Sequence, residues 1–259
     1  MDLGLDSRTY IVSGASKGLG LATADALVRE GARVVLVARD ESRLKSATDL
    51  LGPSAVAVAG DLDDPQVPTR AIEAAYDSFG QLDGALVSVG GPPAGSVLNV
   101  TDDQWTAAFG SVFLGGLRMM REVARATATV GSPMPGQGSS IAVILSSSAI
   151  QALTGISISN GLRPGLGMLV TDLADEVGPM DVRVNGLLPG RFDTERVREL
   201  DESTGDADAN RKRLSGGIPL RRYGSAAEFG KVAAFLLSPA SSYVTGTLIA
   251  VDGGATRVP

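Results

Sequence analysis

The sequence contains neither cysteine nor histidine among its 259 residues. Without cysteine the chain forms no disulfide, no thiolate nucleophile and no cysteine-ligated zinc or iron–sulfur site. Without histidine it lacks the commonest metal ligand and the commonest general base. Any chemistry must therefore use hydroxyls, carboxylates, lysine, arginine or a bound cofactor, and no metal site is predicted.

An excess of positive charge and long apolar runs are also missing. Lys and Arg number 23 against 29 for Asp and Glu, which gives a formal net charge of −6. Nucleic acids and anionic membranes select basic surfaces, so neither is expected as a partner. No window approaches the roughly 18 apolar residues of a membrane span, and the N-terminus has no leader pattern, which favours a cytoplasmic protein.

The hydrophobic content is 44%, which is ample for one well-buried core in a chain of this length. Apolar runs alternate with helical patterns at βαβ spacing. The sequence therefore predicts a single α/β domain over residues 1–259, built on a Rossmann-like, doubly wound parallel sheet of about seven strands. Strands are expected in the apolar run that opens residues 9–20, at 33–38, 55–59, 85–89 and 140–145, in the strand and turn of 182–190, and at 246–254, and helices at 19–30, 41–51 and 66–79.

A glycine-rich turn follows the first apolar run, in the segment TYIVSGASKGLG of residues 9–20. Gly14 permits a sharp turn, Gly18 lets the backbone approach a pyrophosphate, and Gly20 lets the next helix pack closely on the strand. The first N–H groups of that helix would face the anion, so a dinucleotide is the expected ligand. Taken alone, these residues also fit an ordinary glycine-rich turn.

The same residues match a second motif, the G-x-S-x-G nucleophile elbow of serine hydrolases, with Ser16 as the nucleophile. A serine of that kind needs an imidazole base to take its proton. Because the chain has no histidine, the hydrolase interpretation is excluded.

With Ser13, the glycine turn resembles the T-G-x-x-x-G-x-G signature of the short-chain dehydrogenase/reductase family. The segments VRVNGLLPG (residues 182–190) and GTLIAVDGG (residues 246–254) resemble two further family motifs, so the resemblance covers nearly the whole chain. The end of the chain, from Arg221 to Gly254, is most similar to the 3-oxoacyl-thioester reductase branch. The resemblance implies a homotetramer or homodimer with helices around 111–129 and 161–176 at its interfaces.

The resemblance also assigns residues to cofactor binding. Among them, Asp61 would accept a hydrogen bond from the adenine amino group, unless it is only a turn carboxylate. The Phe192 backbone and Thr194 would face the nicotinamide carboxamide and the phosphates. The full set is Ser13, Gly14, Ser16, Lys17, Gly18, Leu19, Gly20, Arg39, Asp61, Leu62, Gly91, Pro189, Gly190, Phe192 and Thr194.

The end of the second strand indicates which dinucleotide is bound. A carboxylate there would bind the ribose 2′-OH of NAD, but the family position for that acid holds Ala38, and Arg39 follows it. Lys17 places a second cation near the same point. The pattern favours NADP over NAD, and the alternative is that both cations are ordinary solvated side chains.

The family's catalytic residues are the clearest departure. Ser146 takes the place of the catalytic serine that hydrogen-bonds the substrate carbonyl, or else belongs to a serine-rich turn without such a role. The family's Y-x-x-x-K pair aligns with Ser159 and Arg163. Ser159 lies 13 residues after Ser146, which is the usual serine-to-tyrosine separation in the family. Residues 88–91 read S-V-G-G where the family usually has N-N-A-G, so only the last glycine, Gly91, is kept. Val112 occupies a position where the family has an asparagine.

A serine hydroxyl is a much weaker acid than a lysine-assisted phenol, and a guanidinium with a pKa above about 12 does not shuttle protons near neutrality. Arg163 can still act electrostatically, with Ser146 or Ser159 donating a hydrogen bond. Alternatively, Ser159 or Asn160 is simply a helix N-cap, because Pro164 fits best in a first helical turn.

Two functions therefore remain open. One is an NADP-dependent oxidoreductase that moves hydride between nicotinamide and a carbonyl or alcohol substrate, with an altered proton donor. The other is an NADP-binding protein without turnover, a sensor or partner subunit. The charged, glycine-bearing segment 191–224 is predicted to be a substrate lid.

Overall fold

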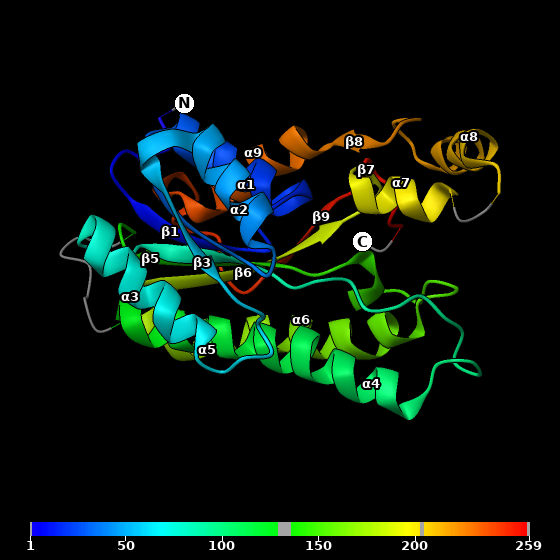
Figure 1. Ribbon diagram of the computed structural model, residues 1–259, viewed down its shortest axis with the longest axis horizontal. Coiled ribbons are helices and arrows are strands. Elements are labelled where there is room, and N and C mark those ends of the chain that lie inside the picture. Colours follow the sequence, from blue (N-terminus) through cyan, green and yellow to red (C-terminus); the bar gives the residue numbers. More distant parts are fainter. Residues whose placement is uncertain (1, 129–135, 203–204, 258–259) are drawn as a thin grey trace.

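Seven parallel strands form one sheet in the order β3-β2-β1-β4-β5-β6-β9 (Figure 1). The computed structural model describes residues 2–128, 136–202 and 205–257. The strands are β1 (Thr9–Ser13), β2 (Arg33–Ala38), β3 (Ala55–Ala59), β4 (Gly84–Ser88), β5 (Ser139–Ile144), β6 (Val182–Pro189) and β9 (Leu248–Val251). The predicted Rossmann-like sheet of about seven strands is confirmed.

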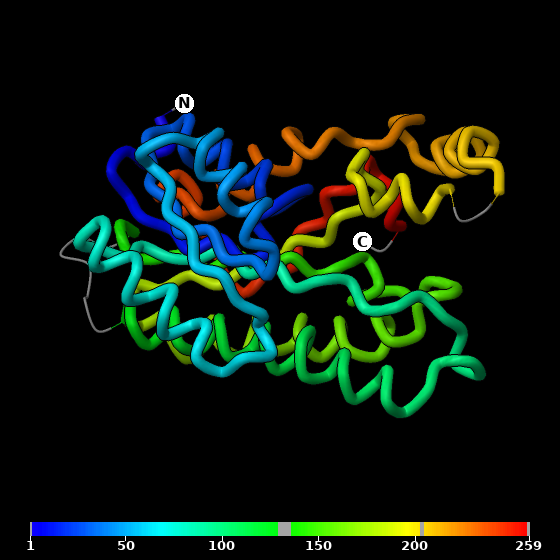
Figure 2. Tube along the Cα trace, viewed as in Figure 1, coloured from blue at the N-terminus to red at the C-terminus, as the bar shows by residue number. Residues whose placement is uncertain are grey.

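Helices cover both faces of the sheet (Figures 1 and 2). Helices α1 (Gly18–Arg29), α2 (Glu41–Leu51) and α9 (Ala226–Leu237) pack on one face, and α3 (Val67–Phe79), α5 (Gly115–Ala128) and α6 (Ser157–Val177) on the other. The inner strands β1, β2, β4, β5 and β6 are buried on both faces, so they read as nearly continuous apolar runs. Along β1, Ile11 belongs to one core, while Tyr10 and Val12 belong to the other.

Glycines allow the closest contacts between these layers. A Cβ at Gly20 would overlap the carbonyl oxygen of Gly14, so the close packing of α1 on β1 requires glycine, as predicted. A Cβ at Gly230 in α9 would likewise overlap the carbonyl oxygen of Ala22 in α1. These contacts fix the start of α1 against the end of β1, where the glycine turn lies.

Helix α6 begins earlier than the N-cap interpretation allows. It starts at Ser157, with Ile156 as the N-cap and no capping side chain, so Ser159 and Asn160 both lie inside the helix. Pro164 is therefore in the helix interior, where its ring removes one backbone hydrogen bond. The interpretation of Ser159 or Asn160 as a helix cap is wrong. Asn160 instead holds the preceding loop through both backbone groups of Leu153, at 3.0 and 2.8 Å.

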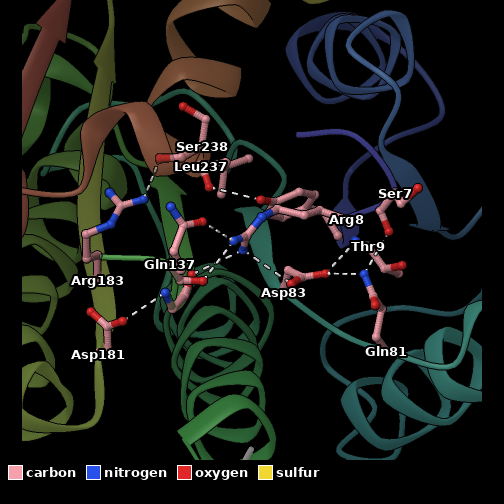
Figure 3. Close-up of polar contacts among 12 residues, drawn as sticks. Ser7, Arg8, Thr9, Gln81, Asp83, Gln137, Asp181, Arg183, Leu237 and Ser238 are labelled. Atoms are coloured by element: carbon pink, nitrogen blue, oxygen red, sulfur yellow. Dashed lines mark hydrogen bonds and ion pairs between the residues drawn. The ribbon is translucent and has the colours of Figure 1, made fainter. Parts of the chain in front are cut away.

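A polar network closes the edge of the sheet at which the strands begin (Figure 3). Arg8, just before β1, donates to Asp83 Oδ1 at 3.3 Å and to the carbonyl oxygen of Gln137 at 2.8 Å. Asp83, just before β4, accepts from the backbone N–H of Thr9 at 2.8 Å. These groups satisfy one another, which leaves the opposite, carboxyl edge as the place for ligands.

Arg183 in β6 belongs to the same region and is 6% exposed (Figure 3). Its guanidinium donates to the carbonyl oxygens of Leu236 at 3.0 Å and Ser238 at 2.8 Å, and to Ser241 Oγ at 2.8 Å. Burial lowers the pKa of Arg183 to about 10, so the side chain stays charged near neutrality. It ties β6 to the end of α9.

The predicted lid segment, 191–224, lies at one end of the molecule (Figure 1). It contains α7 (Glu195–Glu202), α8 (Ala207–Gly217) and β7 (Phe192–Asp193), and its last residue begins β8 (Gly224–Ser225), which pairs with β7 in a two-stranded sheet. Asp201 in α7 accepts from Arg191 at 3.0 Å, Asn210 at 2.8 Å and Tyr223 at 3.4 Å. Residues 203 and 204 of this segment lie outside the described part of the chain. Its movement as a lid stays a prediction.

The remaining helical elements are α4 (Asp102–Ala108), a π-helix at Phe109–Leu114, and 3₁₀ turns at Gly52–Ser54, Ser147–Ala149, Gly178–Met180 and Pro239–Ser241. Helices α4 and α9 each begin with a capping box, in which Thr101 or Ser225 accepts a hydrogen bond from the backbone N–H of the N3 residue. Within residues 2–128, 136–202 and 205–257, no helix is both long and apolar enough to cross a membrane.

Candidate active site

The candidate site lies beyond the carboxyl ends of β1, β4, β5 and β6. β1 and β4 are neighbours in the sheet, and the order of strands runs outward from them in opposite directions. A parallel sheet of this kind has its ligand crevice at that switch point. The chain segments that meet there are the glycine turn after β1, Gly90–Gly91 after β4, the serines after β5 and Gly190 after β6.

The glycine turn has the geometry of an anion site. Gly14 and Gly18 have φ values of +61° and +60°, which favour glycine. The nearest atom to a Cβ built on Gly18 is Thr194 Cγ2 at 3.9 Å, so this face is open. Helix α1 has no side-chain cap at Lys17 and no acidic residue in its first turn. Its first N–H groups are therefore suited to a phosphate.

Ser13 serves a structural purpose next to this turn. It is fully buried, its Oγ donates to the carbonyl oxygen of Ser88 at 2.9 Å, and it accepts from the Ser88 N–H at 2.8 Å. These bonds join β1 to β4. Ser16 and Leu19 lie half-buried in the turn and the first turn of α1.

Two cations meet one carboxylate beside the turn. Lys17 Nζ is 2.9 Å from Glu195 Oε2, and Arg43 from α2 contacts both oxygens of Glu195, at 2.9 and 3.2 Å. Arg39, which follows β2, is 3.5 Å from Asp61 Oδ2 and has a 79% exposed side chain. The sequence analysis did not identify Arg43 or Glu195. A signal for Arg43 was its position four residues after Arg39, near the start of the predicted helix.

These contacts change the ionisation of Glu195. Hydrogen bonds from Arg43 and then Lys17 lower the pKa of Glu195 from 4.5 to about 2. The pKa of Arg43 is raised by the same hydrogen bond. Glu195 is therefore an anion over the whole neutral and mildly acidic range.

Asp61 and Leu62 follow β3 as predicted. Asp61 Oδ1 accepts from the backbone N–H of Asp63 at 3.1 Å, so the carboxylate also shapes the turn. The Leu62 side chain is 8% exposed and packs in the core against Gly115. Its backbone is the only part that can face a ligand at this edge.

A chain of serine contacts lies after β5. Ser146 Oγ accepts from the Ser148 N–H at 3.1 Å, and Ser148 Oγ is 2.8 Å from Ser159 Oγ. Ser148 and Ser159 are 2% and 7% exposed. The structure thus brings Ser146 and Ser159 to the same place through Ser148, which the sequence analysis did not select. The run Ser146-Ser147-Ser148 was its only signal.

Arg163 lies one helical turn beyond Ser159 on α6 and is 4% exposed. Its guanidinium donates to the carbonyl oxygens of Ile144 at 2.7 Å and Gly90 at 3.4 Å, while its Nε has no partner among the described residues. Burial, and then repulsion by Arg196, lower the pKa of Arg163 to about 10. It remains a cation near neutrality, between the ends of β4 and β5.

Arg196 in α7 approaches the same loop from the other side. Its Nη2 is 3.2 Å from the carbonyl oxygen of Pro92, and a Cβ at Gly91 would overlap its guanidinium. Arg196 therefore packs against Gly91, whose predicted contact with the cofactor stays a prediction. A pocket of about 340 Å³ opens there, lined by Gly91, Pro92, Pro93, Ala94, Arg196, Glu199 and Leu200.

The segment after β6 completes the crevice. Pro189 ends β6 beside Val251, and the Gly190 N–H donates to the Val251 carbonyl oxygen at 3.0 Å. The Phe192 ring is buried against Phe229, with ring centroids 5.4 Å apart, so only its backbone is available to a ligand. Thr194 faces Gly18 across the crevice.

One expected polar contact is replaced by apolar packing. Val112, at the position of the family's asparagine, is 2% exposed within the π-helix and belongs to the core. Across the described residues, no group of three or more acidic side chains is arranged to hold a metal ion.

Comparison with known proteins places this arrangement in a family. The model of the family described as enoyl-(acyl carrier protein) reductase matches residues 14–256. An L-rhamnose 1-dehydrogenase (NAD(P)(+)) from Azotobacter vinelandii is 32% identical over 96% of this chain and 97% of its own length. A 3-oxoacyl-[acyl-carrier-protein] reductase from Salmonella typhimurium is 27% identical over 99% of this chain and all of its own.

Two solved structures show the same fold. The L-sorbose reductase of Gluconobacter frateurii, complexed with NADPH and L-sorbose, superposes with a TM-score of 0.92 at 27% identity, covering 100% of both chains. An NADPH-bound short-chain oxidoreductase from Pseudomonas aeruginosa PAO1, described as containing an atypical catalytic center, gives 0.88 at 27% identity over 98% and 99% of the chains. The chain belongs to the short-chain dehydrogenase/reductase family and is an oxidoreductase of that type.

Proposed function

We propose that this chain is an NADP-dependent oxidoreductase that transfers hydride between nicotinamide and the carbonyl or alcohol carbon of a small molecule. One observation carries the proposal: the open glycine turn and the Ser146–Ser148–Ser159 contacts lie at the same carboxyl edge of the sheet. The first provides an anion site and the second provides hydroxyl donors. A single bound molecule that spans the crevice reaches both.

The residues at the adenosine end fit NADP. The uncapped start of α1 suits a pyrophosphate, and Lys17 and Arg39 suit a 2′-phosphate, with no acid at position 38 to bind a 2′-OH. The NADPH complexes of the similar sorbose reductase and Pseudomonas oxidoreductase support this choice. Asp61 would contact the adenine, and the Phe192 backbone and Thr194 the nicotinamide half.

The serines would donate hydrogen bonds to the substrate oxygen, and Arg163 would stabilise its negative charge. Bound NADPH supplies the hydride, and the carbonyl oxygen then needs a proton. Ser146 Oγ accepts from the Ser148 N–H, so its own hydrogen is free to bond that oxygen. The paired Ser148 and Ser159 hydroxyls hold a second hydrogen that they do not use between themselves. The Arg163 cation stabilises the developing alkoxide, and water replaces the proton.

The substrate is proposed to be a small polar carbonyl compound or alcohol. Three of the similar proteins named above are an L-rhamnose dehydrogenase, an L-sorbose reductase and a 3-oxoacyl-[acyl-carrier-protein] reductase. A substrate panel should therefore contain sugar ketones and aldoses, 3-oxoacyl thioesters and simple ketones. Oxidation of NADPH followed at 340 nm with this panel is the primary test, and turnover with at least one class is the expected result.

The replacement of tyrosine and lysine by Ser159 and Arg163 favours a second candidate, an NADP-binding protein without turnover. It predicts no NADPH oxidation with any compound of the panel, together with normal NADPH binding by the parent and by Ser146→Ala, Ser159→Ala and Arg163→Ala variants. Turnover that disappears in Ser146→Ala would eliminate this candidate.

A further inference from the structure

Glu195 occupies an anion position between two cations from separate elements. It is the first residue of α7, and one of its oxygens is 2.9 Å from both Lys17 Nζ and Arg43 Nη1. Its other oxygen is 3.2 Å from Arg43 Nη2, which makes the contact with Arg43 bidentate. Arginine binds carboxylates and phosphates with this same two-point geometry.

Two cations, Lys17 and Arg43, share the single negative charge of Glu195. Arg39 lies four residues before Arg43, and in the described structure it meets only the 3.5 Å contact of Asp61. Arg43 is also 3.4 Å from Asp40, but it keeps its two best contacts for Glu195. A carboxylate brings one negative charge, whereas a phosphate monoester brings about 1.5 to 2 near pH 7.

We propose that Glu195 holds the position that the cofactor's 2′-phosphate requires, and that the two anions compete for Lys17 and Arg43. The inference rests on the proposed function, because it presumes an NADP site at Lys17 and Arg39. It adds Arg43 as a third phosphate-binding cation and makes Glu195 a determinant of cofactor affinity.

Protonation does not release Glu195 at ordinary pH, because its two cations hold its pKa near 2. Displacement by a stronger anion is the remaining route. The contacts are about half exposed, with side chains 44 to 46% accessible, so each is weak enough to be exchanged.

Displacement of Glu195 would also affect the pocket between α7 and the loop after β4. The next residue, Arg196, extends to the carbonyl oxygen of Pro92, and Glu199 and Leu200 of the same helix line the 340 Å³ pocket. Helix α7 thus contacts the adenosine end of the crevice through Glu195 and the pocket through Arg196. Binding of the 2′-phosphate would free the first turn of a helix that forms the pocket wall.

The test uses fragments that differ only in the 2′-phosphate, adenosine 2′,5′-bisphosphate and adenosine 5′-monophosphate, with calorimetry on the full chain. Glu195→Gln should raise the ratio of their affinities by about threefold to tenfold, the size expected when exposed ion pairs that oppose binding are removed. Affinity for the 5′-monophosphate should stay the same. The increase should shrink at high salt, since exposed pairs are screened.

Two variants serve as comparisons. Glu202→Gln removes the same charge from the other end of α7, where the side chain is exposed, and should leave the ratio unchanged. Arg43→Gln in the Glu195→Gln background should lower the ratio, because the proposed third cation is lost.

The outcomes distinguish the competition between Glu195 and the 2′-phosphate from the proposed preference for NADP. A ratio that falls in Glu195→Gln means that Glu195 orients the cations for the phosphate, and an unchanged ratio means that it has no effect; either result overturns the inference. If the parent still prefers the bisphosphate in those cases, the proposed NADP preference stands. If neither the parent nor Glu195→Gln distinguishes the two fragments, both proposals are wrong.

Discussion

At the scale of single residues, the two ends of the crevice make different demands on a side chain. The adenosine end uses exposed cations whose loss does not disturb the core, as the 79% exposure of Arg39 shows. The catalytic end uses buried groups, Ser148, Ser159 and Arg163, which are at most 7% exposed. Variants at the first end report on binding, whereas variants at the second must be checked for stability before activity is compared.

Arg39 gives the simplest binding prediction. Charge-assisted contacts of about 1.5–3 kcal/mol each, reduced by solvent, predict a tenfold to several-hundredfold preference for NADPH over NADH. Arg39→Ala should reduce this preference at least tenfold without changing the thermal unfolding midpoint. Calorimetry with both cofactors measures it, and equal affinities in the parent would contradict the assignment of NADP.

The serines give a prediction about rate. A group that donates to the oxyanion is worth roughly 10²–10³ in kcat, so Ser146→Ala should lower kcat by about that factor at unchanged NADPH affinity. Ser159→Ala should have a smaller effect, within about tenfold, because Ser146 keeps its hydroxyl and its hydrogen bond from the Ser148 N–H, and the Ser148 hydroxyl also remains. If Ser159→Ala is the more damaging variant, the proton donor is Ser159 and the assignment of Ser146 is wrong.

Arg163 makes a harder test because it is buried. Arg163→Lys keeps a cation on α6, whereas Arg163→Met removes it at similar volume. We expect Arg163→Met to lower kcat by at least about 10²-fold and Arg163→Lys to restore part of that loss. A loss of the folded state in both variants would show in the unfolding midpoint, and then Arg163 would count as structural.

At the scale of elements, the edge opposite the site has its own stabilising unit around Arg183. Arg183→Met would remove the buried, charge-assisted hydrogen bonds to the carbonyl oxygens of Leu236 and Ser238 and to Ser241 Oγ, although the two carbonyl oxygens keep donors from Ser140 and Ser241. A hydrogen bond to a charged group contributes about 1.5–3 kcal/mol, so the free energy of unfolding should fall by roughly 2–4 kcal/mol.

Urea denaturation followed by circular dichroism measures this change. The matched control is Arg29→Met, which removes an arginine with a 76% exposed side chain from an i,i+4 pair with Asp25 and should change stability by at most about 0.5 kcal/mol. Equal effects of the two variants would mean that the buried hydrogen bonds of Arg183 do not stabilise the fold.

The elements with strong local patterns are also those that the sequence predicts well. The apolar run 55–59 coincides with β3 and the helical pattern 41–51 with α2, because burial on a sheet and capping by Asp40 are local signals. The start of α6 is predicted wrongly, because Trp105 and Phe113 pack on Gly161 and Gly165 and hold a helix that contains a proline. Such contacts are not visible in a local pattern.

The candidate site divides in the same way. Motif spacing leads to Ser146, Ser159, Arg163 and the glycine turn, since each belongs to a recognisable family segment. It does not lead to Ser148 or to the contact of Glu195 with Arg43, which joins residues 152 positions apart. Motif spacing describes residues that are close in the sequence. It does not indicate which residues from distant segments are brought together by the tertiary fold.

At the scale of the whole molecule, the acidic groups predict how stability depends on pH. Hydrogen bonds from Arg198 and then Arg211 lower the pKa of Asp193 from 3.8 to about 2, and Arg222 does the same for Glu228, from 4.5 to about 2. Between the unfolded and folded pKa values the folded chain binds fewer protons. The stabilisation is therefore complete above about pH 4.5 and is lost as the pH falls towards 2.

The effect should be modest, since these groups are largely exposed and screened by salt. We expect the urea midpoint to fall between pH 5 and pH 3, and to fall less in the double variant Asp193→Asn, Glu228→Gln. A midpoint with the same pH dependence in parent and double variant would show that other carboxylates govern the acid transition.

The last prediction concerns assembly, and it rests on an apolar face that the isolated chain leaves open. Phe109 and Phe113 of the π-helix stack with ring centroids 5.1 Å apart, and Phe113 packs against Gly165 of α6. Met168 lies three residues after Gly165, about one helical turn, and is 71% exposed, while Phe109 is 44% exposed. The resemblance to the family predicts a homodimer or homotetramer through this pair of helices.

Light scattering at micromolar concentration should give at least twice the mass of 26.4 kDa, and Met168→Glu should shift it towards the monomer. Leu50→Glu places the same charge on an equally exposed apolar residue of α2, 70% accessible, and should leave the assembly intact. A parent that is monomeric, or an assembly broken equally by both variants, would contradict this face as the interface, because a charge disrupts an interface only where it must be buried.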